Sequence, residues 1–370
     1  MDINRKLKNI NLTRREFLKF SAMGMGALVL RPSHSIKPTL DDFPKASQLG
    51  RNCTGGIANL RMRPDASSEV VKILYEDTVV EWLREVVGVA PAGTINRRWV
   101  ETPEGYLYAP AIQPVRNIQN LPVTTLPDTP IGRGMWAEVT VPYVDIFIAN
   151  PPARSQWARE IPRTRLYYSQ VLWIDDVATN SNGQVLYRVN EKYGNPGDIY
   201  WAAAEAFRPI SEDEIAPITP EVENKRVVVD LAHQHLVCLE NDREVYFCKV
   251  STGRKFNASG EQVETPLTPL GAHPIWRKLI SIHMAGGTAQ AGWDTMGIGW
   301  TSLFVGDGVA IHSTFWHNNF GSPVSHGCVN CLPEDAKWIF RWTTPVVTAA
   351  IGELTVTMPG GTKIDVVEAG

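Results

Sequence analysis

Short stretches in which apolar and polar residues alternate recur along most of this chain, and residues that favour turns separate them. Two of them are Val70 to Leu74, which Tyr-Glu-Asp follows at 75–77, and Thr78 to Leu83, which a longer segment with Gly and Pro follows. Successive side chains of a strand point to opposite faces of its sheet, so this alternation is typical of strands that cover a core with one face. The chain is therefore predicted to be mostly β.

Length and composition limit the possible classes. The chain has 370 residues, more than one domain usually has, which predicts two or three compact units. Hydrophobic residues make up 44% and charged residues 20%, so buried cores are expected and global disorder is excluded. The net charge is only -3, and no basic run lies beyond the N-terminus. We therefore expect no nucleic-acid partner.

The chain contains five cysteines, an odd number, so at least one thiol is expected to stay unpaired. Cys238 and Cys248 flank a predicted hairpin whose two-residue turn is Asn241-Asp242. This turn would place Cys238 opposite Val245 and would point Cys248 to the other face of the hairpin. A disulfide between these two cysteines is therefore not expected.

The first residues, 1–35, are predicted to be an export signal. Arg14-Arg15 follows a basic stretch and precedes the apolar run from Phe20 to Leu30, an order that resembles a twin-arginine signal. The run is shorter than the roughly 20 residues that span a bilayer, which favours a signal over a permanent anchor. No Ala-x-Ala cleavage site follows Leu30, so an N-terminal membrane tether stays open, as does a basic surface helix. The resemblance implies an exported protein of the cell envelope, either membrane-tethered or wall-associated.

Two β-rich segments follow a predicted linker at 36–52. The first, 53–118, has the order Asn-Leu-Arg-x-Arg-Pro at 59–64 and Gly-Tyr-Leu-Tyr at 105–108, and it resembles a bacterial SH3-like domain, a small β-barrel. The second, 119–215, ends in Ile199 to Ala203 much as the first ends in Tyr106 to Ala109, so it is either a second SH3-like repeat or another β unit. Its aromatic residues either line a groove for sugars or peptides or form its core. An acidic stretch at 211–215 is interpreted as a hinge.

The residues that carry chemistry lie in the last third of the chain. His312 precedes Cys328 by sixteen positions, and Cys328 belongs to the segment Ser-His-Gly-Cys-Val-Asn at 325–330. A cysteine nucleophile reacts as the thiolate, and an imidazole that takes its proton lowers the thiol pKa from about 8.5. Gly327 would let the backbone approach a carbonyl, and N–H groups there could stabilise an oxyanion. The pattern predicts a nucleophile, a base and an oxyanion site.

The order of motifs from Asn224 to Met358 resembles the catalytic domain of the L,D-transpeptidases, the YkuD family. A strand ending in Asp230, Ser-Thr-Gly at 251–253, a Thr-Pro loop at 265–271, His312 and the segment 325–330 occur in the family's order. The resemblance implies a β-sandwich catalytic domain with a short helix. Pro333 and the acidic residues after it predict that helix. Residues 359–370 are expected to form a C-terminal tail.

The resemblance also implies a reaction. Cys328 would attack a carbonyl of a peptidoglycan stem peptide to form a thioester, and an amine of a neighbouring stem would resolve it into a cross-link. His312 would transfer the proton, oriented by the backbone carbonyl of Ser313. The substrate-binding or supporting positions would be Ser313, Ser325, His326, Gly327 and Asn330. Carbapenem-type inhibitors are expected to acylate Cys328, and no cofactor is implied.

Three other interpretations stay open. The same residues could pass the thioester to water, as an L,D-carboxypeptidase or endopeptidase does. The chain could instead be a non-catalytic cell-wall-binding protein. The third is a zinc site, because Cys328 and Cys331 have Cys-x-x-Cys spacing with His312, His317 and His326 nearby. The ligand pattern is incomplete for structural zinc, so no metal site is expected and Cys331 is predicted to be buried beside the nucleophile.

Overall fold

The computed structural model describes residues 40, 42–155, 158–159, 164–194, 197–254, 268–286, 293–306 and 308–368. The predicted export signal lies outside these residues. In the part of the chain that the structure describes, no helix is both long and apolar enough to cross a membrane. Strands dominate, which confirms the prediction of a mostly β chain.

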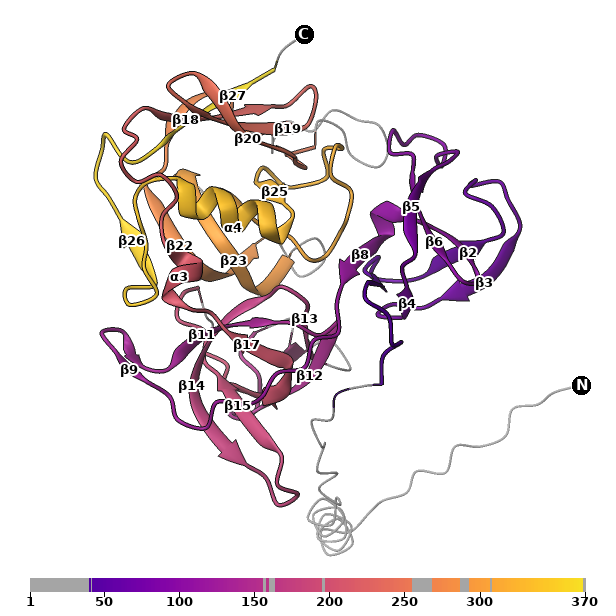
Figure 1. Cartoon of the computed structure of the whole chain (residues 1–370), viewed down its shortest axis with the longest axis horizontal. Helices are drawn as coiled ribbons and strands as arrows, with labels where there is room; N and C mark the ends of the chain where they lie inside the picture. Colours follow the sequence, from indigo (N-terminus) through magenta and orange to yellow (C-terminus); the bar gives the residue numbers. More distant parts are fainter. Residues whose placement is uncertain are drawn as a thin grey trace, which may run out of the picture. The chain divides into compact units, whose positions relative to one another are not determined.

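The first β unit, residues 49–115, contains two sheets (Figure 1). One sheet has the order β3 (Val70–Leu74), β2 (Ala58–Arg61), β7 (Gly105–Tyr108), β6 (Arg98–Thr102) and β5 (Arg84–Val87). The other has β4 (Val79–Glu81), β1 (Leu49–Asn52) and β8 (Ile112–Val115), and the 3-10 helix η1 (Ala109–Ala111) joins β7 to β8. Leu60, Trp82, Val100, Leu107 and Ile112 form its core.

Strand β1 falls inside the segment predicted to be a linker, so that prediction is wrong for 49–52. The strand pairs with β4 on one side and β8 on the other, and all four of its residues are buried. Its sequence, Leu-Gly-Arg-Asn, lacks the alternation of a strand. Arg51 is a charged residue, which a sequence pattern would place in solvent, yet it is only 2% exposed. Its guanidinium can be buried because it donates hydrogen bonds to Asp77 and Gln113.

The middle β unit is a seven-stranded sheet. Its order is β13 (Arg165–Tyr167), β12 (Tyr143–Ile148), β16 (Tyr200–Ala203), β15 (Val185–Val189), β14 (Val171–Thr179), β11 (Met135–Val139) and β17 (Phe207–Pro209). The short strands β9 (Asp128–Thr129) and β10 (Gly132–Arg133) pair separately. Trp173, Tyr187 and Tyr200 are buried, so these three aromatic residues belong to the core.

Both N-terminal units end in the same succession of strand, 3-10 helix and strand. In the middle unit β16, η2 (Ala204–Ala206) and β17 repeat the succession of β7, η1 and β8. The similar endings in the sequence thus correspond to similar local structure. The SH3-like character of either unit stays a prediction.

The third unit is a sandwich of two five-stranded sheets, as expected (Figure 1). The first sheet has β20 (Arg243–Lys249), β19 (His235–Glu240), β18 (Lys225–Asp230), β27 (Lys363–Val367) and β21 (Gly271–Pro274). The second has β25 (Val329–Cys331), β24 (Val309–Ser313), β23 (Trp293–Val305), β22 (Arg277–Gly286) and β26 (Glu353–Thr355). Val227, Leu236, Ile280, Ile311 and Val329 share one buried cluster between the sheets.

The helix predicted after the catalytic motif is present as α4 (Pro333–Trp342), and it packs on β23 and β24. Pro333 at its first position and two acidic residues in its first turn suit the positive end of the helix dipole. At the other end the buried Lys278 donates to the carbonyls of Phe340 (2.5 Å) and Thr343 (2.7 Å). These carbonyls have no partner within the helix, so the amino group satisfies the C-terminal end of α4, while burial lowers the pKa of Lys278.

The expected C-terminal tail is wrong in part, because strand β27 lies within 359–370. It runs parallel to β18 and antiparallel to β21, so it occupies the interior of the first sheet. Ile364 and Val366 are buried in the shared core. The run Lys-Ile-Asp-Val-Val does alternate, but it is short and follows a Gly-Gly pair, which favoured the interpretation as a tail.

The predicted turn at Asn241-Asp242 is confirmed, and both residues have positive φ, 49° and 62°. A bulge after Cys238 shifts the register, however, so that Cys238 lies opposite Tyr246 rather than Val245. Cys248 pairs with Leu236, and both cysteines therefore point into the same core. The expectation that they face opposite sides is wrong. All five cysteines are free thiols in this structure.

Candidate active site

The candidate catalytic pair is positioned by two neighbouring parallel strands. β24 ends with His312-Ser313, and β25 begins one residue after Cys328. His312 is in register with Asn330 across this ladder. Since neighbouring strands lie about 4.8 Å apart, the backbone itself brings the two segments together. Cys328 and His312 both line one pocket of about 670 Å³.

His312 is held in one tautomer. Its ring is 2% exposed, and Nδ1 lies 2.9 Å from the carbonyl oxygen of Ser313. A carbonyl only accepts, so Nδ1 carries the proton and Nε2 offers a lone pair. Burial lowers the pKa of His312 to about 4, and the bond to Ser313 offsets only part of that effect. The imidazole is therefore a neutral proton acceptor near pH 7.

The thiol of Cys328 is half-buried, and its Sγ lies 3.6 Å from the carbonyl oxygen of Gly308. Burial raises the pKa of Cys328 to about 11, although a hydrogen bond from the backbone of Ala310 lowers it in part. We expected the imidazole to lower this pKa. Burial instead raises the pKa of Cys328 and lowers that of His312, so the pair rests as thiol and neutral imidazole.

The segment 325–330 is braced around Ser325. The Ser325 hydroxyl donates to the carbonyl of Cys328 at 2.6 Å and accepts from the Gly327 N–H at 3.1 Å. Thr268 fixes the same turn by donating to the carbonyl of Gly327 at 2.8 Å. Gly327 has φ of 125°, a conformation that side chains disfavour. Because its N–H is already bonded within the turn, Gly327 is not the oxyanion donor that the sequence suggested.

Asn330 supports the segment that follows the catalytic histidine, the His312 loop, residues 315–319. Its side-chain amide lies 2.9 Å from Nε2 of His317, whose Nδ1 accepts from the Asn319 N–H at 3.1 Å. The atom of Asn330 in this contact is the amide nitrogen Nδ2. Burial lowers the pKa of His317 to about 3, so this bridge is uncharged.

Of the remaining predicted residues, the structure places His326 and Ser325 in the lining of the same pocket and Ser313 outside it. His326 is exposed at its edge, and Ser325 lies beneath it. Ser313 is buried, where its hydroxyl accepts from the Gly299 N–H at 3.1 Å. Further lining residues that sequence reasoning missed are Cys53, Thr54, Tyr108, Arg254 and Met284. They are far from the motif in sequence, and only tertiary packing brings them there.

The zinc interpretation is not supported by the geometry. Cys331 is fully buried in the sandwich core, where burial and neighbouring Cys248 raise its pKa, whereas Cys328 faces the pocket. The two thiols of the Cys-x-x-Cys pair therefore point to different places. Within the described residues, the only side chains grouped closely enough to hold an ion are Asp230, His233 and His235, outside this motif.

Comparisons with known proteins agree with this geometry for the third unit. Residues 224–366 match the family model of the L,D-transpeptidase catalytic domain, YkuD. A comparison with curated protein sequences finds no match.

Similar solved structures include an L,D-transpeptidase variant of Enterococcus faecium, at 21% identity, with 40% of this chain and 51% of that chain covered and a TM-score of 0.29. An L,D-transpeptidase of Mycobacterium smegmatis has 16% identity, coverage of 60% and 99%, and a TM-score of 0.30. One solved in complex with imipenem has 17% identity, coverage of 52% and 98%, and a TM-score of 0.30. The chain thus spans about half the length of the Enterococcus faecium chain. By the family model, residues 224–366, which include Cys328 and His312, match the L,D-transpeptidase catalytic domain of the YkuD family.

Proposed function

We propose that this chain is an L,D-transpeptidase that joins peptidoglycan stem peptides, or attaches them to another amine, through a thioester on Cys328. One observation carries the proposal. A thiol and a neutral imidazole with a free acceptor nitrogen line the same pocket, within a domain that matches this family. A nucleophile next to a base whose tautomer is fixed by a third group is the arrangement that acyl transfer requires.

The reaction would proceed in two halves. Nε2 of His312 takes the thiol proton while Sγ of Cys328 attacks the donor carbonyl, and the imidazolium then gives the proton to the departing amine of the terminal residue. In the second half His312 takes a proton from the acceptor amine, which attacks the thioester. The thiolate leaves and regains its proton from the imidazolium. Each half forms one acyl bond and breaks one.

The oxyanion that forms in each half-reaction needs a hydrogen-bond donor. The backbone N–H of Cys328 has no partner among the described residues, whereas that of Gly327 is taken by Ser325. An N–H on the nucleophile itself lies beside the carbonyl under attack, which is a common oxyanion donor in cysteine and serine acyl transfer. We assign this role to Cys328.

The place of action is part of the proposal. The twin-arginine-like segment would export the chain to the cell envelope, where its substrate lies, and the first β unit would act as an SH3-like domain. The sequence pattern of 1–35 and the order of residues in 53–118 support these assignments. Reporter fusions of 1–40 with and without Arg14-Arg15 replaced by Lys-Lys would test export.

The deciding experiment is intact-mass spectrometry of the protein with imipenem, beside Cys328→Ala. We expect one covalent adduct on the wild type and none on the variant. A folded, reduced wild type without an adduct would contradict acyl-enzyme chemistry. Turnover of a stem tetrapeptide with and without an amine acceptor then separates transfer from hydrolysis, since only transfer yields a cross-linked mass.

A further inference from the structure

The catalytic pocket is not built by the catalytic unit alone. Its lining includes residues from two segments of the first β unit, Cys53 and Thr54 in one and Tyr108, Pro110 and Ala111 in the other. From the catalytic unit come Arg254, His326 and the two reacting residues. Thr54 is exposed and Tyr108 half-buried, so both present surface to whatever enters the pocket.

The first β unit also holds the His312 loop in place. Arg98 on β6 donates to the carbonyl of Asn318 at 2.6 Å. The Asn318 N–H donates to the carbonyl of Pro110 at 3.1 Å, and its side-chain amide donates to Ala109 at 3.3 Å. Three hydrogen bonds thus converge on one loop residue that is itself 2% exposed.

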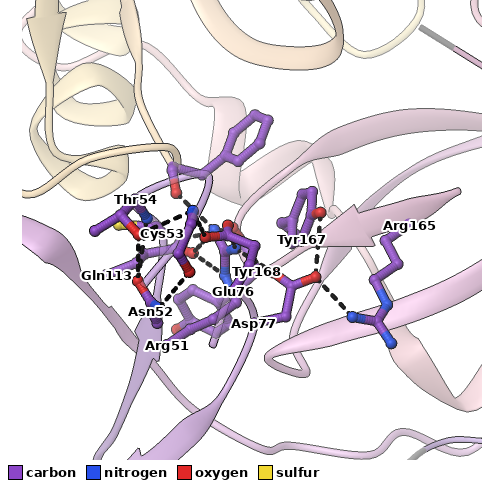
Figure 2. A network of polar contacts seen from close by, with 12 residues as sticks. Arg51, Asn52, Cys53, Thr54, Glu76, Asp77, Gln113, Arg165, Tyr167 and Tyr168 are labelled. Carbon is purple, nitrogen blue, oxygen red and sulfur yellow. Dashed lines mark hydrogen bonds and ion pairs between the residues drawn. The ribbon is translucent and has the colours of Figure 1, made fainter. Parts of the chain in front are cut away.

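A second connection runs through Arg51, shown in Figure 2. Its guanidinium binds Asp77 at 2.7 Å and donates to the carbonyl of Phe315, the first residue of the loop, at 3.0 Å. Asp77 also accepts from Arg165 of the middle unit at 2.6 Å, and the Arg51 guanidinium lies 4.1 Å from the ring centre of Tyr167. Since Arg51 and Asp77 are buried, these contacts are shielded from solvent.

The loop fixed in this way directly contacts the catalytic residues. Trp316 lies 5.8 Å from His312, ring centre to ring centre, and lines the pocket. His317 bridges to Asn330 of the catalytic motif. Displacement of the loop would therefore move one wall of the pocket and a neighbour of the base together.

We propose that the first β unit is part of the substrate-binding site: Thr54 and Tyr108 contact the peptide portion of the substrate, and Arg98 positions the His312 loop. This inference rests on the proposed function. The wall is uncharged, and its hydroxyls, Thr54 and Tyr108, donate to Asn52 and Asn96 and keep lone pairs that can accept from a peptide N–H. Arg254, which also lines the pocket, suits a substrate carboxylate. The Nε of Arg254 already donates to Val324 at 2.9 Å, which anchors the guanidinium at the rim.

The wall is tested by Thr54→Trp, which places a large side chain over the pocket. Ser67→Trp is the matched control, because both are exposed turn residues whose hydroxyls bond a side chain two positions earlier, Asn52 or Asp65. We expect KM for a stem tetrapeptide to rise about tenfold in Thr54→Trp and to stay unchanged in Ser67→Trp. An unchanged KM for the stem tetrapeptide in Thr54→Trp would overturn the inference. A wild type that imipenem does not acylate would instead contradict the proposed function and this inference with it.

The positioning role is tested by Arg98→Ala, Arg98→Lys and Arg84→Ala. Arg84 is the control because it forms an ion pair with Glu101 across β5 and β6, as Arg98 does with Glu85. The Arg84 side chain does not reach the His312 loop. We expect Arg98→Ala to lower kcat about tenfold with little change in KM, and Arg98→Lys to restore part of the loss. Arg84→Ala should leave kcat unchanged. Equal kcat in the two alanine variants, or a loss in Arg98→Ala that the lysine does not relieve, would overturn the positioning role.

Discussion

At the scale of single residues, the catalytic pair combines two unfavourable ionisations. Burial disfavours both the thiolate of Cys328 and the imidazolium of His312, so the neutral pair is the resting state. A substrate carbonyl changes the balance, because the charge that develops on attack is transferred to an oxyanion held by a backbone N–H. The thiolate need not exist before the substrate arrives.

A pH profile of imipenem acylation follows from these pKa values. His312 acts as a base only when neutral, so the rate should fall as pH drops through about 4, and it should show no inflection between pH 6 and 7. Alkylation of Cys328 by iodoacetamide should keep rising above pH 9, because the thiol pKa is about 11. The measurement is intact mass against time. An acylation inflection near pH 6.5 would contradict a fully desolvated imidazole.

Ser325 is expected to govern the turn that presents the nucleophile. Ser325→Ala removes its bonds to the Cys328 carbonyl and the Gly327 N–H, which leaves two backbone groups without a partner and costs about 1–3 kcal/mol. Acylation should slow about tenfold or more because Cys328 loses its orientation. Ser251→Ala is the control, since this buried serine also bonds two backbone groups, the Ser322 carbonyl and the Val324 N–H, but neither Gly327 nor Cys328. Similar acylation rates in the two variants would exclude a specific role for Ser325.

The candidate reacting residues could be proposed from sequence for two reasons. Cys328 lies in a short motif, 325–330, and His312 precedes this motif in the order that the family has. The structure places Cys328 and His312 on one pocket and the carbonyl of Ser313 against His312, and their catalytic roles stay predictions. Arg51 and Arg98 could not be predicted, because an arginine in a strand pattern indicates solvent exposure. Their partners, Phe315 and Asn318, are more than two hundred positions away, and no local signal connects them.

At the scale of secondary-structure elements, a charged histidine joins the hairpin of β22 and β23 to the middle unit. His283 on β22 is 4% exposed, and its ring nitrogens lie 2.7 Å from Glu191 and 2.5 Å from Asp294. Burial alone would lower the pKa of His283, but the two carboxylates raise it to about 9. Its neighbour Met284 lines the catalytic pocket, so this ion pair supports a wall of the pocket.

This ion pair predicts a loss of stability at alkaline pH. The folded pKa of His283 is raised above the unfolded value of about 6.5, so its contribution is complete below pH 6.5 and disappears as pH rises through about 9. Between pH 7 and 10 the wild type should lose about 2–3 kcal/mol more than His283→Gln. Chemical denaturation at several pH values measures this difference. Parallel curves for the two proteins would contradict a charged His283.

The acidic segment interpreted as a hinge is instead a short helix, α3 (Glu212–Ile215). Ser211 caps it with a capping box, and Glu214 accepts from Arg208 and from Lys337 of α4, both at 2.6 Å. The Ser-x-x-Glu spacing could have predicted the helix. The ion pairs could not be predicted, because they depend on how α4 packs. Local signals such as caps and turns therefore predict elements, whereas β1 and β27 depend on partners distant in sequence.

At the scale of the whole described molecule, three β units meet at one buried charged cluster. Arg51 and Asp77 come from the first unit, Arg165 and Tyr167 from the middle unit, and the Phe315 carbonyl from the catalytic unit. Buried charges are costly unless every partner is present. The cluster therefore favours one relative arrangement of the three units over others.

Asp77→Asn should destabilise the protein by about 3 kcal/mol, because it removes the carboxylate that the buried Arg51 and Arg165 share. Arg165 keeps its ion pair with Asp145 at 2.8 Å, and Arg51 keeps only Glu76 at 3.7 Å. Asp242→Asn is a close control. Both aspartates have positive φ, 64° and 62°, which asparagine tolerates, and both pair with an arginine, but the side chain of Asp242 is 78% exposed. It should cost less than about 1 kcal/mol. Equal unfolding free energies in urea would show that the cluster contributes little.

The parallel pairing of β24 with β25 places His312 opposite Asn330, two residues after Cys328, through main-chain hydrogen bonds. The crossover between the two strands carries Trp316, His317 and the contacts to the first β unit. Part of the pocket wall thus lies on a stretch of chain far from the candidate reacting residues, at Thr54 and Tyr108 of the first β unit. An enzyme engineer could diversify these two positions to change which substrates fit and leave the segments that hold Cys328 and His312 untouched.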